Sequence, residues 1–462
     1  MPVGYSSIRR GAFFRERRQL ALEQGEKLYR PASATLDFEA ITAPDNLVKV
    51  FKWLMYTAGT ATGPDRVRFT EPGRSEVWRL MVALSSDLRN GIYRLGDAKR
   101  IGIPRPGRKP RFITIRELFD RVVSAALQSA LRDILDAQFL PGSHGFRPGR
   151  GVLTLLAQLA IGIRLTGYHW IVNDDIRNAF DSVPRQFVLD CHRPLVSCPR
   201  LLSLLEIVLQ ANAAQPVGLD QGGSYSPTAF NLSSHKLLDQ EMGLNLLPLW
   251  FRYADNLAYL CPSEAKARDT RRNITTLLAT QRLELKGPEP QSIIDLRERS
   301  TPLLGFTLRT HDDDLILTVD ETAWDELRAH LIEAYQDGCS PTAVATQLCQ
   351  QWARVYGPGL KDPDCEARRI IALLREHGIR ESLTKDAVAR TILQSHSDWD
   401  LLLQSTSRVY STDSRTFELR DPRRSRVGYE CPPKQILHVR DTPASAGTVV
   451  NNRFRDVPFL IG

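Results

Sequence analysis

Residues 250–261 read Trp-Phe-Arg-Tyr-Ala-Asp-Asn-Leu-Ala-Tyr-Leu-Cys and place Asp255 and Asn256 between two apolar runs. This pattern predicts two short strands that are joined at the polar residues. Residues 170–176, Trp-Ile-Val-Asn-Asp-Asp-Ile, predict a further strand, and Asp175 lies near its end. Carboxylates in apolar strands are costly to bury unless they are paired or bind a cation. The prediction of the fold extends outward from these strands.

Two aspartates from separate strands could converge on one pair of Mg²⁺ ions, which is what in-line phosphoryl transfer needs. The cations would bring together the attacking hydroxyl, the phosphorus and the leaving pyrophosphate. A simpler interpretation is that each aspartate ends a strand or caps a turn, and composition alone favours it. The order of the surrounding motifs is needed to choose between the two.

The elements on either side of these strands predict an α+β fold. Residues 101–116 interrupt apolar residues with prolines and glycines, which predicts a short two-stranded ribbon with basic residues at its turn. Beyond about residue 404, frequent Ser, Thr, Arg, Pro and Asp predict an irregular tail. Apolar residues at helical spacing predict helices over 76–88, 120–139, 201–210 and 227–241, after Pro184, and throughout 322–400.

The chain has 462 residues, of which 42% are hydrophobic and 25% charged, and these values exclude a wholly disordered or fibrous protein. Lys and Arg number 61 against 53 Asp and Glu, so the net charge is +8. The excess gathers in residues 99–116, where basic residues occur without any acid. A cluster of this density is typical of contact with a polyanion.

The seven cysteines are spread along the chain and form no zinc-type spacing, which predicts reduced thiols. Arginines interrupt the N-terminal residues, so that no secretory signal is expected. The longest apolar run, residues 152–163, is too short to cross a bilayer. We therefore expect a soluble, cytoplasmic protein without a membrane partner.

Six blocks of sequence occur in the order found in the reverse transcriptase family, and the chain resembles most closely the bacterial branch with group II intron and retron enzymes. A specific match is residues 142–150, Gly-Ser-His-Gly-Phe-Arg-Pro-Gly-Arg, which is similar to a block of the intron-type enzymes. The resemblance covers about residues 95–310. The other blocks are 107–111, 175–181, 221–227 with Asn231, 253–256 and 303–306.

The resemblance implies a right-hand polymerase with fingers, a palm with an antiparallel sheet, and a helical thumb. It implies an RNA-directed DNA polymerase that adds dNTPs to a 3′ end by two-metal phosphoryl transfer. The partners would be an RNA template, a DNA primer and product, and, as a further candidate, a non-coding RNA. The expected domains are a basic arm at 1–60, fingers at 61–165, the palm at 166–315, a thumb or maturase-like unit at 316–403 and a tail at 404–462.

The metal site of the family maps onto the two aspartates. The resemblance assigns Asp175, Ile176 and Asp255 to Mg²⁺, with Mn²⁺ as the alternative. It gives Asn256 an assisting catalytic role, although most relatives have a second Asp there, so that the site loses one negative charge. Asp174 should not replace this charge, because adjacent residues of a strand point to opposite faces.

The remaining blocks imply contacts with substrate and nucleic acid. Lys109 and Arg111 would meet the triphosphate, and a solvated basic turn is the simpler interpretation. Phe180 would lie under the sugar and clash with a 2′-hydroxyl, or would pack as a core aromatic. The resemblance also assigns Gln221 and Gly222 to the nascent base pair, and Arg147, Tyr253 and Gly305 to primer and template.

Two further positions depart from the family. Asp220 stands where relatives usually have proline, which could change the rigidity or charge of the template loop. Lys286 is the candidate general acid for pyrophosphate, and the threonine that usually follows is displaced by Gly-Pro-Glu-Pro. No nuclease-like cysteine or histidine cluster is seen in residues 320–462, which favours a free-standing bacterial enzyme, with phage defence as a hypothesis.

Two alternatives to a reverse transcriptase stay open. The same fold could support a template-independent or RNA-primed nucleotidyltransferase. Asn256 also leaves room for a polymerase-shaped nucleic-acid-binding protein with little catalysis.

Overall fold

The helices and strands that the sequence predicts are present in the computed structural model, which also contains elements that were not predicted, such as α6 (Val152–Thr166), α12 (Glu264–Ala279) and the strands between residues 293 and 319. The described residues are 37–58, 61–105, 108–210, 214–244, 249–336, 341–379 and 383–412. The first 36 residues of the predicted basic arm and the predicted tail beyond residue 412 lie outside them.

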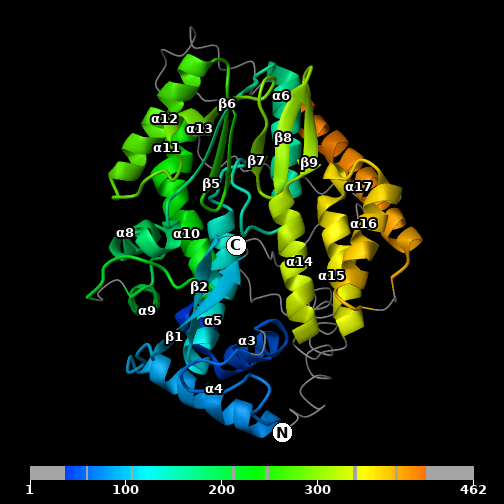
Figure 1. Cartoon of the computed structure of the whole chain (residues 1–462). Helices are drawn as coiled ribbons and strands as arrows, with labels where there is room; N and C mark the ends of the chain where they lie inside the picture. The colour runs from blue at the N-terminus through cyan, green and yellow to red at the C-terminus, as the bar shows by residue number, and fades with distance from the viewer. Residues whose placement is uncertain are drawn as a thin grey trace, which may run out of the picture.

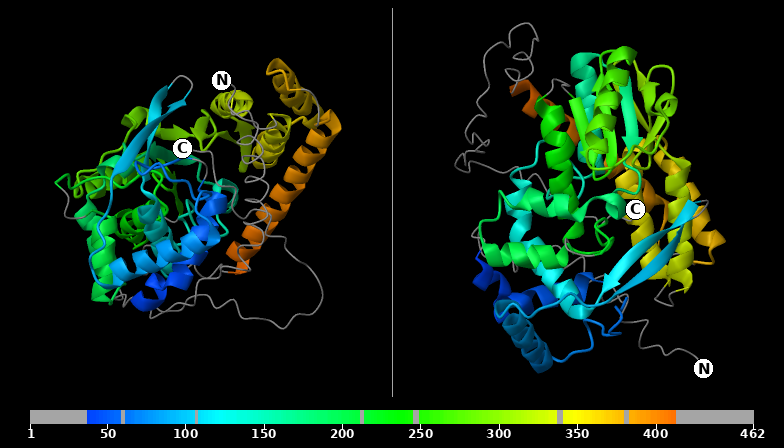
Figure 2. Two further views of the ribbon diagram at one scale, coloured as in Figure 1. Left: turned by 90° about the horizontal axis from the view of Figure 1, so that it is seen from below. Right: turned by 90° about the vertical axis from the view of Figure 1, so that its left-hand side faces the viewer.

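The N-terminal region consists of helices and one long ribbon (Figure 1). The predicted ribbon forms as an antiparallel pair whose register matches Ala98 with Arg116. It projects away from the helices in both views of Figure 2. The elements are α2 (Phe38–Thr42), α3 (Pro44–Thr57), α4 (Arg74–Arg89), β1 (Ala98–Arg105), β2 (Arg108–Arg116) and α5 (Leu118–Asp136).

The central sheet has four antiparallel strands in the order β4-β5-β3-β6. The two predicted strands around the polar pair are β4 (Leu249–Tyr253) and β5 (Asn256–Cys261), and the predicted acidic strand is β3 (Trp170–Asp175). The register pairs Asp175 with Asn256. Two motifs that are far apart in the sequence therefore meet at one end of the sheet.

Helices surround this sheet, and a small antiparallel sheet in the order β7-β8-β9 follows it. The helix predicted over 227–241 is present, but a π-helical segment, which the sequence did not indicate, interrupts it. The elements are α6 (Val152–Thr166), α7 (Ala179–Ser182), α8 (Arg185–His192), α9 (Pro199–Val208), α10 (Ser226–Ser234), the π-helix η1 (His235–Asp239), α11 (Gln240–Leu244), α12 (Glu264–Ala279), α13 (Glu289–Ser292), β6 (Ile293–Asp295), β7 (Thr301–Leu303), β8 (Phe306–His311) and β9 (Asp314–Val319).

The C-terminal region is helical, as predicted, and runs along one side of the molecule (Figure 1). The predicted irregular tail begins later than expected, because the last helix continues to Thr412. Residues 404–412 contain neither Pro nor Gly, so a helix that has already formed can propagate through them. The elements are α14 (Glu321–Gln336), α15 (Pro341–Tyr356), the 3₁₀-helix η2 (Gly357–Gly359), α16 (Pro363–Glu376) and α17 (Lys385–Thr412).

Two hydrophobic cores lie on opposite faces of the central sheet, because neighbouring residues of a strand point to opposite sides. Val172 belongs to the core that contains α3, α5 and α10, whereas Ile171 belongs to the core that contains α6 and the C-terminal helices. On β5, Leu257 and Ala258 divide between the same two cores. Both cores therefore pack against the sheet, one on each face, and this packing holds the strand ends that carry Asp175 and Asp255 in place.

Among the described residues, no helix is both long enough and apolar enough to cross a membrane. The described cysteines are free thiols, and Cys261 and Cys349 are buried. Burial raises the pKa of Cys261 to about 11 and that of Cys349 to about 12. Both thiols stay protonated at neutral pH and act as packing residues, because a reactive cysteine needs its thiolate.

Candidate active site at the end of the central sheet

The turn between β4 and β5 brings Asp255 next to the end of β3. The Ile176 N–H donates to the Asp255 carbonyl oxygen at 3.0 Å, and Asp175 pairs with Asn256 across the strands. Burial, followed by repulsion from the Asp175 carboxylate, raises the pKa of Asp255 to about 7. The second charge of this carboxylate pair is therefore only partly present at neutral pH unless a cation compensates it.

The two oxygens of the Asp175 carboxylate have different surroundings. Lys286 Nζ lies 2.8 Å from Oδ2, and the Lys286 N–H also donates to the Asp175 carbonyl oxygen at 2.8 Å. Oδ1 is buried and has no hydrogen-bond partner among the described residues. A buried carboxylate oxygen without a partner is costly, and a divalent cation would satisfy it.

The backbone of Ile176 lies beside the Asp255 turn. Ile176 pairs with Leu285 in an antiparallel bridge, but the hydrogen bonds of this bridge are made by the residues on either side. The Lys286 N–H donates to Asp175 and the Arg177 N–H donates to Glu284, so the backbone groups of Ile176 do not point toward Leu285. The N–H of Ile176 donates instead to Asp255. In an extended strand the N–H and C=O of one residue point the same way, so we expect the Ile176 carbonyl on that side. Two carboxylates and a carbonyl form an oxygen set that suits Mg²⁺.

The described residues contain no cluster of three or more His, Cys, Asp or Glu side chains that could hold a metal. The candidate metal site therefore depends on two aspartates and backbone. Asn256 adds an amide, with Nδ2 3.4 Å from Asp255 Oδ1 and 3.5 Å from the Tyr253 carbonyl oxygen. Bonds of this length are weak. The amide donates toward Asp255, whereas a carboxylate at this position would repel it.

Asp174 faces the other side of β3, as predicted. Its buried carboxylate accepts hydrogen bonds from Ser292 Oγ at 2.6 Å and from the Gly287 N–H at 2.9 Å. Arg271 Nη2 lies 3.2 Å from the same carboxylate. Asp174 therefore joins β3 to α12 and to the 287–292 segment, and it does not supply the charge that Asn256 lacks.

The loop that carries Gln221 packs against β2. The Thr114 N–H donates to the Gln221 carbonyl oxygen at 2.6 Å, and Arg111 Nε lies 3.4 Å from Gln221 Oε1. Gly222 has a φ of +105°, and a Cβ on it would lie 3.1 Å from the Thr114 carbonyl oxygen, so the loop requires glycine here. The structure thus brings Arg111, Gln221 and Gly222 together. Lys109 lies on β2, but its side chain is outside the described residues.

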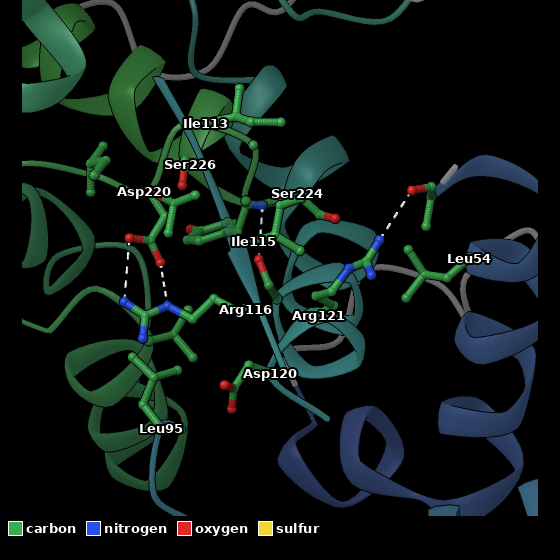
Figure 3. Close-up of a pocket in the computed structure, with 18 of the residues that line it drawn as sticks. Leu54, Leu95, Ile113, Ile115, Arg116, Asp120, Arg121, Asp220, Ser224 and Ser226 are labelled. Atoms are coloured by element: carbon green, nitrogen blue, oxygen red, sulfur yellow. Dashed lines mark hydrogen bonds and ion pairs between the residues drawn. The ribbon is translucent and has the colours of Figure 1, made fainter. Parts of the chain in front are cut away.

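A cavity of about 540 Å³ lies between this loop, β2 and helices α3 and α5 (Figure 3). Arg116 and Asp220 line it as a bidentate ion pair, with Nε 2.5 Å from Oδ2 and Nη2 3.3 Å from Oδ1. Arg116 Nη1 also donates to the Gly96 carbonyl oxygen at 2.9 Å. The acid that replaces the usual proline therefore ties the loop to the base of the ribbon.

Phe180 makes an aromatic contact of the kind expected if it is a core residue. Its ring stacks on Phe230 with centroids 4.7 Å apart and an interplanar angle of 27°. The side chain is only partly buried against the first core. The predicted contact of Phe180 with a sugar stays a prediction.

Arg147 requires a correction. The side chain was expected at primer or template, but it is buried, with Nε 2.6 Å from Asp136 Oδ1. Its Nη1 donates to the Leu140 and Ser143 carbonyl oxygens, each at 2.8 Å. A guanidinium whose donors are used in this way is not presented to nucleic acid. Arg147 instead holds the 142–150 segment against the end of α5, where its Nη2 donates to the carbonyl oxygen of Asp136, the last residue of the helix, at 3.2 Å.

The other two residues assigned to primer and template lie at turns. Tyr253 is buried at the end of β4, and its ring centroid is 6.3 Å from that of the exposed Phe146. Gly305 follows Leu304 in the turn between β7 and β8. A Cβ on Gly305 would lie 2.6 Å from the Tyr356 hydroxyl, so the C-terminal region packs directly on this turn. Their contacts with nucleic acid stay predictions.

The sequence prediction missed Arg252 and Asp239, which form a fully buried ion pair below the Asp255 turn. Arg252 lies in the apolar run that singled out Asp255. A charged residue in such a strand needs a buried partner. The same physical reasoning could therefore have identified Arg252, although not the partner.

Comparison with known proteins identifies relatives of this region. Residues 103–289 match the family described as reverse transcriptase (RNA-dependent DNA polymerase). The chain is 28% identical over 203 residues to Protein YkfC of Escherichia coli (strain K12), across 42% of this chain and 53% of that protein. It is 27% identical over 158 residues to group II intron-encoded protein LtrA of Lactococcus lactis, across 32% and 26% of the two chains. The chain thus spans about half of YkfC and less of LtrA.

A solved structure of telomerase from Candida albicans with the TWJ fragment of telomeric RNA aligns with 72% of this chain and 67% of that chain. The sequence identity is 12% and the TM-score 0.36, so this likeness carries no argument about the site. The family match is more informative, because residues 103–289 include both aspartates and the Gln221 loop. It confirms the resemblance to reverse transcriptases and the expected right-hand polymerase fold class.

Proposed function

We propose that this chain is an RNA-directed DNA polymerase that extends a primer with dNTPs, because residues 103–289 match the reverse transcriptase family. The observation that carries the proposal is the juxtaposition of Asp175 and Asp255. One oxygen of Asp175 is buried without a partner, and Asp255 has a pKa raised to about 7. Such a pair favours a bound divalent cation.

The residues that would hold Mg²⁺, or Mn²⁺ as the alternative, are Asp175, Asp255 and the carbonyl of Ile176. When bound, the cations would stabilise charge on the attacking and leaving oxygens of the phosphoryl transfer. Lys286 presents an ammonium group at the edge of the site, 2.8 Å from Asp175, where it can donate a proton to the departing pyrophosphate. Arg111 and the other cations of the ribbon would orient the triphosphate.

The nucleic-acid partners in this proposal are an RNA template and a DNA primer. The ribbon and the Gln221 loop border the 540 Å³ cavity, which is large enough to receive an unpaired template base before it is copied. Contacts of the basic ribbon with phosphates carry no sequence information and weaken as salt rises. Binding to an RNA–DNA duplex should therefore fall steeply between low and high ionic strength.

Extension of a DNA primer on an RNA template tests the proposal. Wild-type protein with Mg²⁺ should extend the primer, and Asp255→Ala should reduce extension below detection. Asp400→Ala, which removes an exposed acid from α17, is the matched control and should extend normally. A wild-type protein that gives no metal-dependent extension, with any co-purifying RNA retained, contradicts the proposal, as does full activity of Asp255→Ala.

The same assay separates the alternatives. Product made without template would identify a template-independent or RNA-primed nucleotidyltransferase. Asn256 favours a catalytically weak protein, because the site has one charge fewer than a pair of aspartates would give. An increase in extension on Asn256→Asp would show that the amide lowers activity, whereas a loss would show that the site is built around it.

Phe180 tests the choice of sugar. If its ring excludes a 2′-hydroxyl, Phe180→Ala should incorporate ribonucleotides more readily relative to deoxynucleotides, by about tenfold or more. Incorporation of each nucleotide from otherwise identical mixtures gives the ratio. An unchanged ratio would leave Phe180 as a core aromatic, stacked on Phe230.

A free-standing bacterial enzyme with a role in phage defence is a narrower proposal that rests on family resemblance alone. Sequencing of RNA that co-purifies with the full chain tests for a non-coding RNA partner. A single abundant RNA species would support that partner, and a random mixture of cellular RNA would contradict it.

A further inference from the structure

We propose that Arg252 and Asp239 are positioning residues that fix the turn carrying Asp255. This inference rests on the proposed function, because it concerns the geometry of the same carboxylates. The pair is completely buried, with Arg252 Nε 2.8 Å from Asp239 Oδ1 and Nη2 2.6 Å from Oδ2. Neither residue touches the metal or the substrate in the mechanism given above.

Every N–H of the Arg252 guanidinium has an acceptor. Two of them meet Asp239, and the other three meet the Asn231 side chain at 2.9 Å, the Ser143 hydroxyl at 2.9 Å and the Ala254 carbonyl oxygen at 3.0 Å. The acceptors come from α10, from the 142–150 segment and from the turn itself. One side chain therefore connects three separate parts of the chain at a single buried point.

The bond to Ala254 is the one that acts on the site. Ala254 has a φ of +53°, which is a left-handed conformation that alanine rarely adopts. Such a residue persists only where its surroundings over-determine it. The Arg252 bond holds the carbonyl of Ala254, and the next residue along the chain is Asp255. Rotation of this peptide would therefore move the Asp255 carboxylate relative to Asp175.

The 142–150 segment supports the turn from the other side. The Arg252 N–H donates to the Gly142 carbonyl oxygen at 2.9 Å, and the His144 N–H donates to the Arg252 carbonyl oxygen at 2.8 Å. A Cβ on Gly145 would lie 2.5 Å from the Ala254 nitrogen, so only glycine permits this approach. The backbone and side chain of Arg252 thus share one task, which is to hold this segment and the turn together.

The π-helical segment explains how Asp239 reaches its partner. Asp239 is the last residue of η1, which lies between the α-helices α10 and α11. A π-helical turn inserts an extra residue, shifts the following side chains around the axis, and is frequently found at functional sites. Here the π-helical turn places the buried Asp239 carboxylate against the buried Arg252 guanidinium. This placement favours a role of the pair in positioning the β4–β5 turn.

Stability alone does not account for the pair. Removing two charges from water is expensive, and a buried ion pair can often be replaced by well-packed apolar residues without loss of stability. What an apolar pair could not supply is the set of directed hydrogen bonds to Ala254, Ser143 and Asn231. The specific geometry of the turn is therefore the property that the pair provides.

The decisive experiment replaces both charges with apolar residues of similar length, Arg252→Met with Asp239→Leu. We expect a folded protein with a lower melting temperature, because the acceptors on Asn231, Ser143 and Ala254 lose their donors. The kcat for primer extension should fall on the order of 100-fold, because a displacement of about 1 Å at reacting groups costs this much. The KM for dNTP should change less than about twofold. Wild-type kcat in the folded double variant would overturn the proposal.

Two further readouts do not depend on polymerase activity. The affinity for Mn²⁺, titrated by electron paramagnetic resonance, should fall about 10-fold or more in the double variant, as is usual when a residue that orients metal ligands is lost. In the metal-free protein, amide hydrogen exchange at residues 253–256 should become faster. Unchanged Mn²⁺ affinity and unchanged exchange would show that the pair is merely structural.

A second variant and a control complete the design. Arg252→Lys keeps the charge but cannot make the five directed bonds, so it should lose kcat and Mn²⁺ affinity even if the double variant does not fold. Leu205→Ala opens a cavity at a fully buried position of α9 and should lower the melting temperature without these effects. If wild-type protein does not extend primers at all, the proposed function fails, while the Mn²⁺ and exchange measurements still decide the positioning role.

Discussion

The β4–β5 and β7–β8 hairpins both end in two-residue turns, and side chains of different chemistry hold them. In the β4–β5 hairpin the turn is clamped by the buried Arg252, which binds the Ala254 carbonyl oxygen. In the β7–β8 hairpin the turn is covered by the ring of Tyr356, which fits against Gly305. Ala254 and Leu304 share a left-handed backbone, with φ of +53° and +52°.

The difference follows from what each turn must do. In the β7–β8 turn the Tyr356 ring packs against Gly305, and the Gly305 carbonyl oxygen accepts a backbone hydrogen bond from Asp320 at 3.0 Å, so no charged side chain is needed to hold it. The β4–β5 turn must present the Asp255 carboxylate at a defined place. Directed hydrogen bonds control orientation in a way that apolar contacts do not. Three substitutions or measurements test this contrast, and one tests the Arg116–Asp220 ion pair at the base of the ribbon, in order from the largest expected effect to the smallest.

Gly305→Ala should cost the most. The Cβ of the new alanine would lie 2.6 Å from the Tyr356 hydroxyl, and the alanine would have to adopt the φ of +82° that Gly305 has. We expect a loss of about 3 kcal/mol in the free energy of unfolding, measured with urea. Gly91→Ala is the matched control, because Gly91 has a φ of +70° and nothing within 4 Å of a Cβ. It should lose only about 1 kcal/mol, and equal losses would show that Tyr356 does not constrain the turn.

The pH dependence of the metal-free protein tests the β4–β5 turn. Asp255 has a pKa of about 7 when folded, against an ordinary value of 3.8, so the folded protein binds more protons between these values. Stability must then fall as pH rises through this window, by about 2 kcal/mol between pH 5 and pH 7. Thermal melts with a chelator present give the slope. Asp255→Asn should remove this contribution, and an unchanged slope would contradict the raised pKa.

Asp220→Asn tests whether the ion pair at the base of the ribbon acts as a tether. The Arg116 and Asp220 side chains are only 13% and 19% exposed, so loss of the charge should cost about 1–2 kcal/mol of unfolding free energy. Asp314→Asn is the control, because it breaks a 2.7 Å pair with Arg164 whose side chains are 43% and 67% exposed. That change should cost under about 0.5 kcal/mol. Equal effects in urea unfolding would mean that the pair near the cavity is no tether.

Ala254→Gly should have the smallest effect and the opposite sign. Glycine adopts a φ of +53° without strain, so the free energy of unfolding should rise by up to about 1 kcal/mol, as measured by urea unfolding. A decrease in stability would mean that the methyl group of Ala254 contributes more by packing than it costs in strain.

The elements that carry the site were predictable because their signals are local. The apolar run 250–261 contains its own turn, and the acidic strand at 170–176 ends as its pattern indicated. The opposite orientation of Asp174 and Asp175 follows from the alternation of side chains in any strand. These features needed no knowledge of the rest of the chain.

The features that were missed depend on partners distant in sequence. No local pattern indicates the π-helical turn at 235–239, whose last carboxylate meets Arg252. Arg147 was correctly singled out as part of a motif, but its burial depends on carbonyl oxygens at the end of α5 and on Asp136. The later end of α17 was missed for another reason, because polar composition was interpreted as irregular structure.

The repeated aspartate at the end of β3 gives the strand a second possible alignment. A slip of one residue would exchange the faces of every side chain, yet Asp174 would then occupy the place of Asp175, and a carboxylate would still face the metal position. Such a misaligned strand would place the neutral Asn173, in place of Asp174, opposite Arg271. It would also lose the hydrogen bonds that Asn173 Nδ2 donates to the Thr301 hydroxyl at 2.8 Å and to the Pro302 carbonyl oxygen at 2.7 Å. The ion pair of Arg271 with Asp174 thus favours the observed alignment of β3 over the shifted one, and it does so from the face of the sheet opposite to Asp175.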